Sequence, residues 1–325
     1  MKSSAAAHPN IAFIKYWGNL DHDLRLPANG SISMTLGGLQ TRTTVEFDPD
    51  LSQDSFILDG AQAAQESLRR VSQQLDLIRS LAGFPYKARV QSENSFPAGT
   101  GIASSASGFA ALTVAACAAA ELELPPKELS RLARRASGSA SRSIFGGFVE
   151  WHKASTDEGS YAEQLAPADH WSLVDWVAVV DEEEKEVGSS QGHRLADTSP
   201  LQEARISSAA GRLTATRQAI LSQDFATLAR FAELDSDMMH AVMMTSNPPL
   251  HYWRPTTVEV MQRIRRLRSQ GIPVFYTLDA GPNPHCLCPE DRAEIVQEAL
   301  LKIPGVRRLL RAEPGGPARV LSEAD

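Results

Sequence analysis

The sequence contains few cysteines and has no excess of positive charge. Three cysteines in 325 residues are too few for a disulfide framework, so we expect a reducing compartment, the cytoplasm. The net charge of -7 argues against a general binder of nucleic acid or of an anionic membrane surface. An anionic ligand must therefore be met by a local group of basic residues.

Long apolar segments are missing as well. No uninterrupted apolar run approaches membrane-spanning length, and the N-terminal residues MKSSAAAHP lack the apolar core of a signal peptide. Hydrophobic residues make up 42% of the chain and charged residues 22%, which is typical of a globular protein. Because 325 residues exceed the usual size of a single core, we expect two domains, at 1–182 and 183–325.

The stretch at 97–108 is the most distinctive part of the sequence. Gly99 and Gly101 allow backbone angles that other residues resist, so successive N–H groups can point toward one centre. The same stretch supplies three hydroxyl groups where a helix is expected to begin, from Ser104, Ser105 and Ser107. Free N–H groups at a helix N-terminus favour a phosphate group as ligand. The alternative is a flexible surface loop before an ordinary helix, since neither a Walker sequence nor a dinucleotide fingerprint is present.

The spacing of apolar residues predicts the α+β fold class, because strands and helices do not alternate regularly. Strands are predicted at 10–17, 31–36, 42–47, 86–91, 145–151, 173–180, 272–278 and 318–321. Helices are predicted at 68–82, from the loop at 97–108 to Pro125-Pro126, and at 127–136, 199–222, 224–244, 256–270 and 290–302.

Three residues outside the loop are candidates for chemistry. Asp279 ends a predicted buried strand, where a rigid sheet would aim its carboxylate, although Asp before Ala-Gly-Pro also suits a plain turn. Arg142 lies among small residues that leave room for a two-bond contact with a carboxylate or phosphate; the alternative is a surface arginine. Lys15 follows an apolar run, and its alternative is a lysine that extends from a strand edge into solvent.

Three further groups favour structural interpretations over metal binding. Cys286 and Cys288 share one face of a predicted strand, but structural zinc needs four ligands and Cys117 lies in the Ala-rich helix. His240 lies among methionines, which is typical of a core or interface residue. The acidic run at 181–186 is interpreted as a solvated loop.

Together these segments resemble the GHMP kinase superfamily and, within it, the diphosphomevalonate decarboxylases. The motifs that carry the resemblance are NIA…KYWG at 10–18, P…NGSIS at 27–33, the loop at 97–107, SGSASRS and GGFVEW at 137–151, GSS at 188–190 and DAGPN at 279–283. Each motif is weak alone, but their shared order along most of the chain is specific.

The resemblance implies an N-terminal domain like domain 2 of ribosomal protein S5, a GHMP kinase C-terminal domain and an active-site cleft between them. It also implies an enzyme that uses ATP and Mg2+ to decarboxylate a phosphorylated mevalonate. The resemblance further implies that the protein is a homodimer. Asp279 would act on the substrate's 3-hydroxyl group, Arg142 would bind the C1 carboxylate, and Lys15 would stabilise charge on the phosphoryl group or on Asp279.

The other implied site residues form two sets. The substrate-binding set is Asn10, Tyr16, Asn19, Ser139, Arg142, Ser189 and Ser190. The ATP-binding set is Asn94, Gly99, Gly101, Ser104, Ser105 and Ser107.

One departure from the family pattern affects the expected substrate. Asn19 stands where the decarboxylases usually carry a lysine that reaches the terminal phosphate, and Gly30 replaces the usual serine after Asn29. The loss of a cation favours a less charged tail, so we expect mevalonate 5-phosphate to be the substrate and isopentenyl phosphate the product. Arg25 could compensate for the missing lysine, in which case the substrate would be mevalonate 5-diphosphate.

Two other functions remain open at the level of sequence. A mevalonate 3-kinase would transfer phosphate without decarboxylation, but it has no need of a carboxylate clamp such as Arg142. A ligand-binding protein without catalysis would be expected to have lost the phosphate loop or the Asp279 and Arg142 pair, and the sequence retains both.

Overall fold

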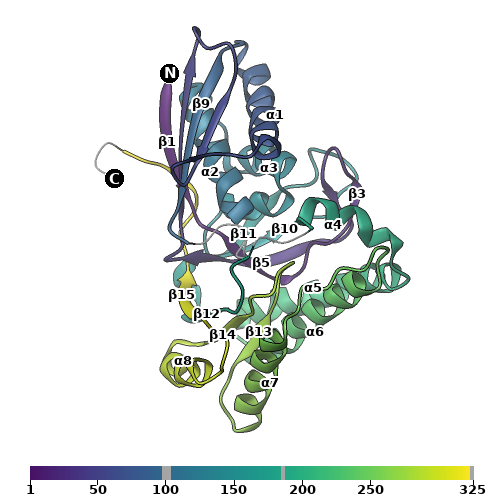
Figure 1. Cartoon of the computed structure of the whole chain (residues 1–325). Coiled ribbons are helices and arrows are strands. Elements are labelled where there is room, and N and C mark those ends of the chain that lie inside the picture. Colours follow the sequence, from purple (N-terminus) through teal and green to yellow (C-terminus); the bar gives the residue numbers. More distant parts are fainter. Residues whose placement is uncertain (97–103, 184–186, 323–325) are drawn as a thin grey trace.

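Two large β-sheets and the helices packed on them make up the protein (Figure 1). The computed structural model describes residues 1–96, 104–183 and 187–322. The strands are β1 (Lys2–Ala7), β2 (Asn10–Ile14), β3 (Asn19–Asp21), β4 (Leu26–Pro27), β5 (Ser31–Gly37), β6 (Thr41–Asp48), β7 (Ser55–Leu58), β8 (Ala61–Gln62), β9 (Lys87–Asn94), β10 (Phe148–Trp151), β11 (Ala162–Ala166), β12 (Leu173–Val179), β13 (Phe275–Thr277), β14 (His285–Pro289), β15 (Arg308–Pro314) and β16 (Arg319–Val320).

Helices separate and cover these strands. The α-helices are α1 (Gln65–Ala82), α2 (Ser104–Ala119), α3 (Pro126–Ala136), α4 (Ser189–Leu195), α5 (Gln202–Ser222), α6 (Phe225–Met244), α7 (Pro255–Ser269) and α8 (Ala293–Leu301). Short 3-10 helices are η1 (Gly138–Ile144), η2 (Ala168–His170), η3 (Ala196–Thr198) and η4 (Glu290–Arg292).

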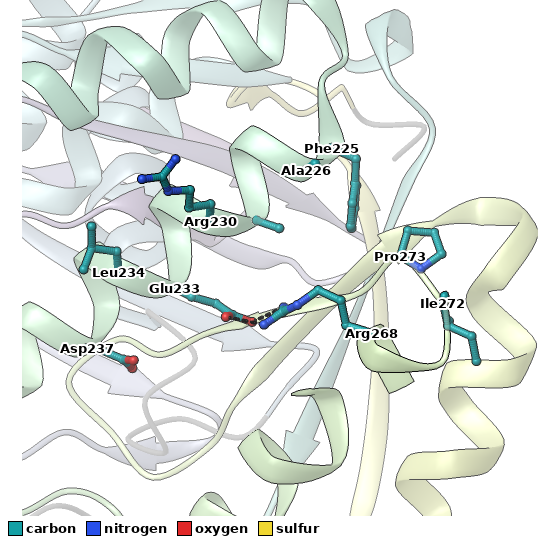
Figure 2. A pocket seen from close by; sticks show the side chains of 11 residues that line it. Phe225, Ala226, Arg230, Glu233, Leu234, Asp237, Arg268, Ile272 and Pro273 are labelled. Carbon is teal, nitrogen blue, oxygen red and sulfur yellow. Dashed lines mark hydrogen bonds and ion pairs between the residues drawn. The ribbon is translucent and has the colours of Figure 1, made fainter. Parts of the chain in front are cut away.

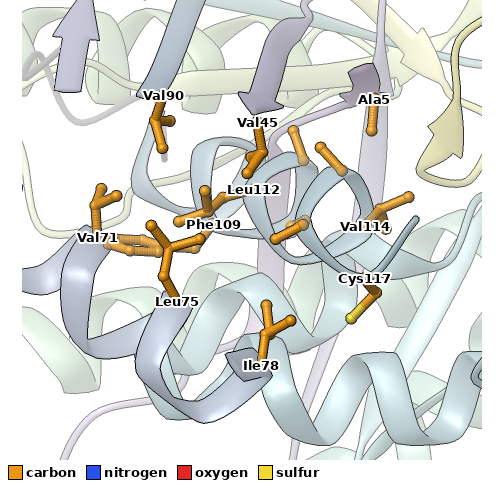
Figure 3. Close-up of a cluster of buried hydrophobic side chains, with 14 of the residues drawn as sticks. Ala5, Val45, Val71, Leu75, Ile78, Val90, Phe109, Leu112, Val114 and Cys117 are labelled. Carbon is orange, nitrogen blue, oxygen red and sulfur yellow. The ribbon is translucent and has the colours of Figure 1, made fainter. Parts of the chain in front are cut away.

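The first sheet has the strand order β16-β1-β6-β9-β7-β8 and packs against α1, α2 and α3 (Figure 3). Its core includes Val45 and Val90 from the strands and Leu75, Phe109 and Leu112 from the helices. Buried and exposed residues alternate along β6 and β9, as expected for strands with one covered face. Helix α2 is buried along most of its length, since its Ala and Gly residues allow close packing.

The second sheet has the order β11-β10-β5-β15-β12-β14-β13, with β2 paired to β5. Strand β12 is buried at every position because both of its faces are covered. Val177 and Val179 pack with residues of α5 and α6, whereas Val174, Trp176 and Ala178 pack with residues of α7 and α8. In Figure 1 these helices lie at the opposite end of the molecule from α1 and α3.

Strands from the end of the chain tie the two halves together. β15 pairs with β12 and with β5, and β16 pairs with β1. The second sheet therefore takes strands from both sides of the predicted boundary at residue 182. Among the described residues, no helix is long and apolar enough to cross a membrane.

Most predicted elements are confirmed, although the strands predicted at 145–151 and 272–278 are shorter, at Phe148–Trp151 and Phe275–Thr277, and two other predicted elements end early. The helix after the loop ends at Ala119 and not at the two prolines, because Glu121 adopts a left-handed φ of 56° and the Leu122 N–H donates to the Cys117 carbonyl. Pro125 and Pro126 begin α3 instead. The strand predicted at 10–17 pairs only as far as Ile14, after which the chain leaves the sheet.

We predict that Gly147→Ala destabilises the protein more than Gly271→Ala does. Both glycines have a positive φ, 73° and 85°, where alanine costs about 1–2 kcal/mol. A Cβ at Gly271 meets no atom within 4 Å, whereas at Gly147 it would overlap the Ala166 carbonyl oxygen. Overpacking should add about 1–3 kcal/mol at Gly147. Urea unfolding of the two variants measures the difference, and equal losses would contradict the prediction.

Candidate functional site

A buried ion pair lies at the centre of the candidate site. Lys15 Nζ donates to Asp279 Oδ1 at 2.6 Å, across 264 positions of sequence. The Lys15 side chain is 1% exposed and that of Asp279 is 25% exposed, so only the carboxylate reaches solvent. Burial would raise the pKa of Asp279, but the charge and hydrogen bond of Lys15 outweigh it and lower this pKa. Burial lowers the pKa of Lys15 although the Asp279 carboxylate opposes the shift.

The backbone of Lys15 is held by a second buried network. Asp235 on α6 is fully buried, and its Oδ1 accepts the Lys15 N–H at 2.9 Å. Arg212 Nε donates to Asp235 Oδ2 at 2.6 Å. Arg205 donates to the Lys15 carbonyl at 2.8 Å and lies 3.5 Å from Asp235 Oδ1. Helices α5 and α6 therefore fix the point where β2 ends and Lys15 turns toward Asp279.

Asp279 is positioned from β13 and α6. The strand next to it is tied to β2, since Thr277 Oγ1 donates to the Ala12 carbonyl at 3.2 Å. His240 Nε2 lies 3.2 Å from the Asp279 carbonyl oxygen. A carbonyl oxygen can only accept, so His240 carries its proton on Nε2. Burial lowers the pKa of His240 to about 3, which keeps the imidazole neutral beside Lys15.

Arg142, on η1, is 2% exposed and has no carboxylate partner among the described residues. Its Nε and Nη2 donate to Asn10 Oδ1, and Nη1 donates to Ser31 Oγ at 2.6 Å. Nε also donates to Ser33 Oγ at 3.0 Å. Burial lowers the pKa of Arg142 to about 10, still well above neutral pH. Arg142 is thus a buried cation held by neutral oxygens, with one N–H of each terminal nitrogen left for a ligand.

Asn10 and Ser139 belong to the same cluster. Asn10 Nδ2 donates to Ser143 Oγ at 2.7 Å and to the Ser139 carbonyl at 3.1 Å. These bonds assign Nδ2 as the donor, so Oδ1 faces Arg142. Ser139 is half-buried, and its hydroxyl lies 3.5 Å from that of Ser137.

Tyr16 and Asn19 form a separate polar group beyond Lys15. The Tyr16 hydroxyl donates to Asn19 Oδ1 at 2.5 Å, and Asn19 Nδ2 lies 3.1 Å from His22 Nδ1. Gly138 lies against the Tyr16 ring, because a Cβ at this glycine would overlap it. Arg25 Nε donates to the Arg135 carbonyl at 3.0 Å. Burial raises the pKa of Tyr16, and the positive charge of Arg25 opposes part of that rise.

The remaining predicted residues lie at two helix starts. Ser189 and Ser190 are half-buried in the first turn of α4. Ser104 and Ser105 begin α2, where Ser105 Oγ lies 3.4 Å from Ser137 Oγ. Ser107 is fully buried; its hydroxyl lies 2.7 Å from that of Thr41 and donates to the Ser104 carbonyl.

Three residues of the predicted ATP-binding set remain: Asn94, Gly99 and Gly101. Asn94 ends β9, where its N–H and Nδ2 donate to the carboxylate of Asp59. Gly99 and Gly101 lie outside the described residues. The predicted roles of all these residues stay predictions.

A pocket of about 560 Å³ lies away from this cluster, between α6 and the turn after α7 (Figure 2). The Glu233 and Arg268 side chains form an ion pair in it, at 2.6 Å, between apolar residues such as Phe225 and Ile272. None of its lining residues is a predicted site residue. The predicted cleft therefore does not correspond to this pocket.

Comparison with known proteins matches both halves of the chain. Residues 7–162 match the diphosphomevalonate decarboxylase-like N-terminal domain, and residues 176–309 match the mevalonate 5-diphosphate decarboxylase C-terminal domain. The phosphomevalonate decarboxylase of Haloferax volcanii is 34% identical over 100% of this chain and 99% of its own length. The chain belongs to the diphosphomevalonate decarboxylase family.

Other relatives agree with this family. The diphosphomevalonate decarboxylase of Candida albicans is 35% identical, over 98% of this chain and 94% of its own length. A solved structure of MDDEF in complex with MVAPP, AMPPCP and magnesium has a TM-score of 0.93 and 38% identity, and the match covers 99% of each chain. These similarities confirm the predicted family, fold class and class of enzyme.

A solved relative holds magnesium together with the nucleotide AMPPCP. The described residues contain no group of three or more His, Cys, Asp or Glu side chains that could hold a metal. Mg2+ is usually bound by substrate phosphates with one or two carboxylates, so no dedicated protein site is needed. Cys286 and Cys288 are buried in an apolar cluster.

The sequence analysis missed three residues of the site. Asp235 and Arg205 lie on helices that were predicted, but nothing in the spacing of a single helix shows which polar residue turns inward. His240 was predicted to be buried, and it is 1% exposed; its bond to the Asp279 carbonyl was not predicted. A polar residue in an otherwise apolar helix face was the only available signal.

We predict that Asp235→Asn destabilises this family member by about 3–5 kcal/mol, because two buried arginines lose their counter-charge. The matched control is Glu66→Gln, which breaks the solvent-exposed pair with Arg69 and should have little effect on stability. Thermal and urea unfolding measure both variants. A loss for Asp235→Asn no larger than for Glu66→Gln would show that the network contributes little.

Proposed function

We propose that the protein is an ATP-dependent decarboxylase of a phosphorylated mevalonate, and that mevalonate 5-phosphate is its preferred substrate. The observation that carries the proposal is Arg142, a buried cation with unused N–H groups beside the Lys15 and Asp279 pair. A buried charge without a partner is costly, so an anionic group of the substrate completes this arrangement. The planar guanidinium suits a carboxylate.

The C1 carboxylate bound to Arg142 directs the 3-hydroxyl group toward Asp279. Oδ1 of Asp279 is occupied by Lys15, and Oδ2 has no partner among the described residues. In the first step, the 3-hydroxyl oxygen forms a bond to the γ-phosphorus of ATP, ADP leaves, and Asp279 takes the hydroxyl proton. Lys15 holds positive charge beside the carboxylate and the phosphoryl group as they react.

The second step releases CO2. The bond between C1 and C2 breaks, its electron pair forms the C2–C3 double bond, and the C3–O bond breaks to release phosphate. The products are isopentenyl phosphate, CO2, ADP and phosphate. When bound, Mg2+ would neutralise charge on the ATP phosphates, with Ser104 and Ser105 at the start of α2 contacting those phosphates.

The preference for the monophosphate is supported by the uncharged side chain of Asn19, which is expected to face the phosphorylated end of the substrate. The Asn19 side chain is bonded to Tyr16 and lies within hydrogen-bond distance of His22. Because this residue is asparagine and not lysine, it brings no positive charge to the position. The Haloferax relative that spans the whole chain is named a phosphomevalonate decarboxylase. Arg25 supplies positive charge close to Tyr16, and that charge can attract the phosphate group of either substrate.

We also propose a homodimer in the cytoplasm. The homodimer follows from the family resemblance. The three cysteines are free, as expected in a reducing compartment. Sedimentation of the purified protein tests the dimer.

The function is tested by incubating the purified protein with ATP and Mg2+ and with each of three substrates, and by measuring ADP and CO2 together. Mevalonate 5-phosphate should give the highest kcat/KM, with equal amounts of ADP and CO2. Higher efficiency with mevalonate 5-diphosphate would make that compound the substrate. ADP without CO2, from these or from mevalonate, would indicate a 3-kinase, and no turnover would indicate a binding protein.

We predict that Asp279→Asn lowers kcat by about 10²–10⁴-fold, the usual contribution of a general base. The variant also removes the anion that supports the charge of Lys15, whose pKa already lies below 10.5 because of burial. The alkaline fall of the residual rate should therefore move to lower pH. The control Asp291→Asn alters an exposed aspartate on η4, outside the predicted site, and should keep the parent rate. Unchanged kcat in Asp279→Asn would remove Asp279 from the mechanism.

We predict that Asn19→Lys shifts selectivity toward mevalonate 5-diphosphate, because the added ammonium group attracts the more highly charged tail. The kcat/KM ratio for the diphosphate over the monophosphate should rise by about tenfold, which corresponds to about 1.4 kcal/mol. Asn19→Gln is the control, since it adds length without charge. An unchanged ratio in the lysine variant would show that Asn19 does not select the tail.

A further inference from the structure

His193 joins α4 to the segment that carries Tyr16 and Asn19. It is 6% exposed, and its ring lies between two aromatic rings. The ring centroids of His193 and Tyr16 are 4.0 Å apart with an interplanar angle of 30°. Those of His193 and Trp17 are 4.6 Å apart at 37°. One imidazole thus contacts two successive residues of the proposed substrate segment.

A hydrogen bond fixes this ring and the backbone next to it. The Gly18 N–H donates to His193 Nδ1 at 3.0 Å, so the ring proton resides on Nε2. Burial lowers the pKa of His193 to about 3, and the neutral ring that accepts this bond persists through the physiological pH range. Gly18 has a φ of 93°, a conformation that few other residues adopt, and the bond to His193 anchors it there.

The rest of α4 approaches the same segment closely. A Cβ at Gly192 would overlap the Trp17 ring. Gln202 Nε2 donates to the Trp17 carbonyl at 3.0 Å, which holds the chain from the next helix. Asn19 follows Gly18 directly, and its side chain is bonded to the Tyr16 hydroxyl. Any shift of Gly18 must therefore move the Asn19 side chain and the Tyr16 hydroxyl, the two groups proposed to bind the phosphorylated end of the substrate.

We propose that His193 is a positioning residue that sets the selectivity for the phosphorylated end of the substrate. This inference rests on the proposed function, because Tyr16 and Asn19 matter only if a phosphorylated tail binds beside them. His193 acts through Gly18 and the Tyr16 ring, and it does not take part in phosphoryl transfer or in CO2 loss. His193 therefore affects how the phosphorylated end of the substrate binds, and it does not affect the chemical steps at Asp279.

Two substitutions separate the functions of the His193 ring. His193→Phe keeps an aromatic ring between Tyr16 and Trp17 but leaves the Gly18 N–H without an acceptor. His193→Asn loses the ring and places an amide oxygen near the position of Nδ1, where it can accept this N–H. The matched control is His170→Asn, which alters a histidine whose Nε2 lies 2.8 Å from the Ile220 carbonyl oxygen.

The readouts are kcat and KM for mevalonate 5-phosphate and 5-diphosphate, together with calorimetric binding of mevalonate and of mevalonate 5-phosphate. We expect His193→Phe to raise KM for the monophosphate about tenfold, the effect of a buried N–H that loses its acceptor, with kcat close to the parent value. Binding of mevalonate, which has no phosphate, should stay unchanged. His193→Asn should recover most of the loss, and His170→Asn should show none.

Three results would overturn the inference: a fall in kcat at constant KM, equal weakening of mevalonate and mevalonate 5-phosphate, or an asparagine variant as impaired as the phenylalanine variant. If His193→Phe does not fold, Tyr16→Phe removes the bond to Asn19 and must give the same selective rise in KM. The parent protein decides the proposed function separately. If it turns over none of the phosphorylated substrates, the function fails, whereas a parent that is active with variants of unaltered selectivity refutes only the inference.

Discussion

The buried carboxylate of Asp235 is the interaction on which the candidate site depends. It accepts the backbone N–H of Lys15 and is paired with Arg212, while Arg205 reaches both Asp235 and the Lys15 carbonyl. All of these groups are buried, so loss of the Asp235 carboxylate would leave two buried arginine charges without their counter-charge. The network has to form completely, and once formed it fixes where β2 ends. The position of Lys15, and hence of its contact with Asp279, follows from that end point.

The two cations of the site, Lys15 and Arg142, have different kinds of partner. Lys15 is neutralised by Asp279 within the protein, whereas Arg142 is surrounded by the neutral oxygens of Asn10, Ser31 and Ser33. The hydrogen bonds to these oxygens and the nearby charge of Asp279 offset part of the desolvation cost of Arg142. This difference agrees with the two proposed roles, in which Lys15 supports the reaction and Arg142 binds the substrate.

The sequence predicted the elements more completely than the contacts. Strands with alternating residues, such as β6, and helices with regular apolar spacing, such as α1, follow from local pattern and were found where expected. The motif residues Asp279, Arg142 and Asn10 were predicted to act together because they resemble a family, and no spacing within the chain could have joined positions so far apart. Asp235 and His193 were missed because each acts through the backbone of a distant residue, which local pattern does not encode.

The neutral state of the buried histidines has a physical consequence for the site. His240 donates to the Asp279 carbonyl and His193 accepts from the Gly18 N–H, so each ring serves as a fixed dipole and not as a charge. Burial lowers the pKa of both to about 3, and the cations Lys15 and Arg25 oppose protonation of the ring beside them. A charged imidazole at either position would compete with Lys15 for Asp279 or add a cation beside Asn19. Because both rings stay neutral, the cationic side chains next to Asp279 are Lys15 and Arg142.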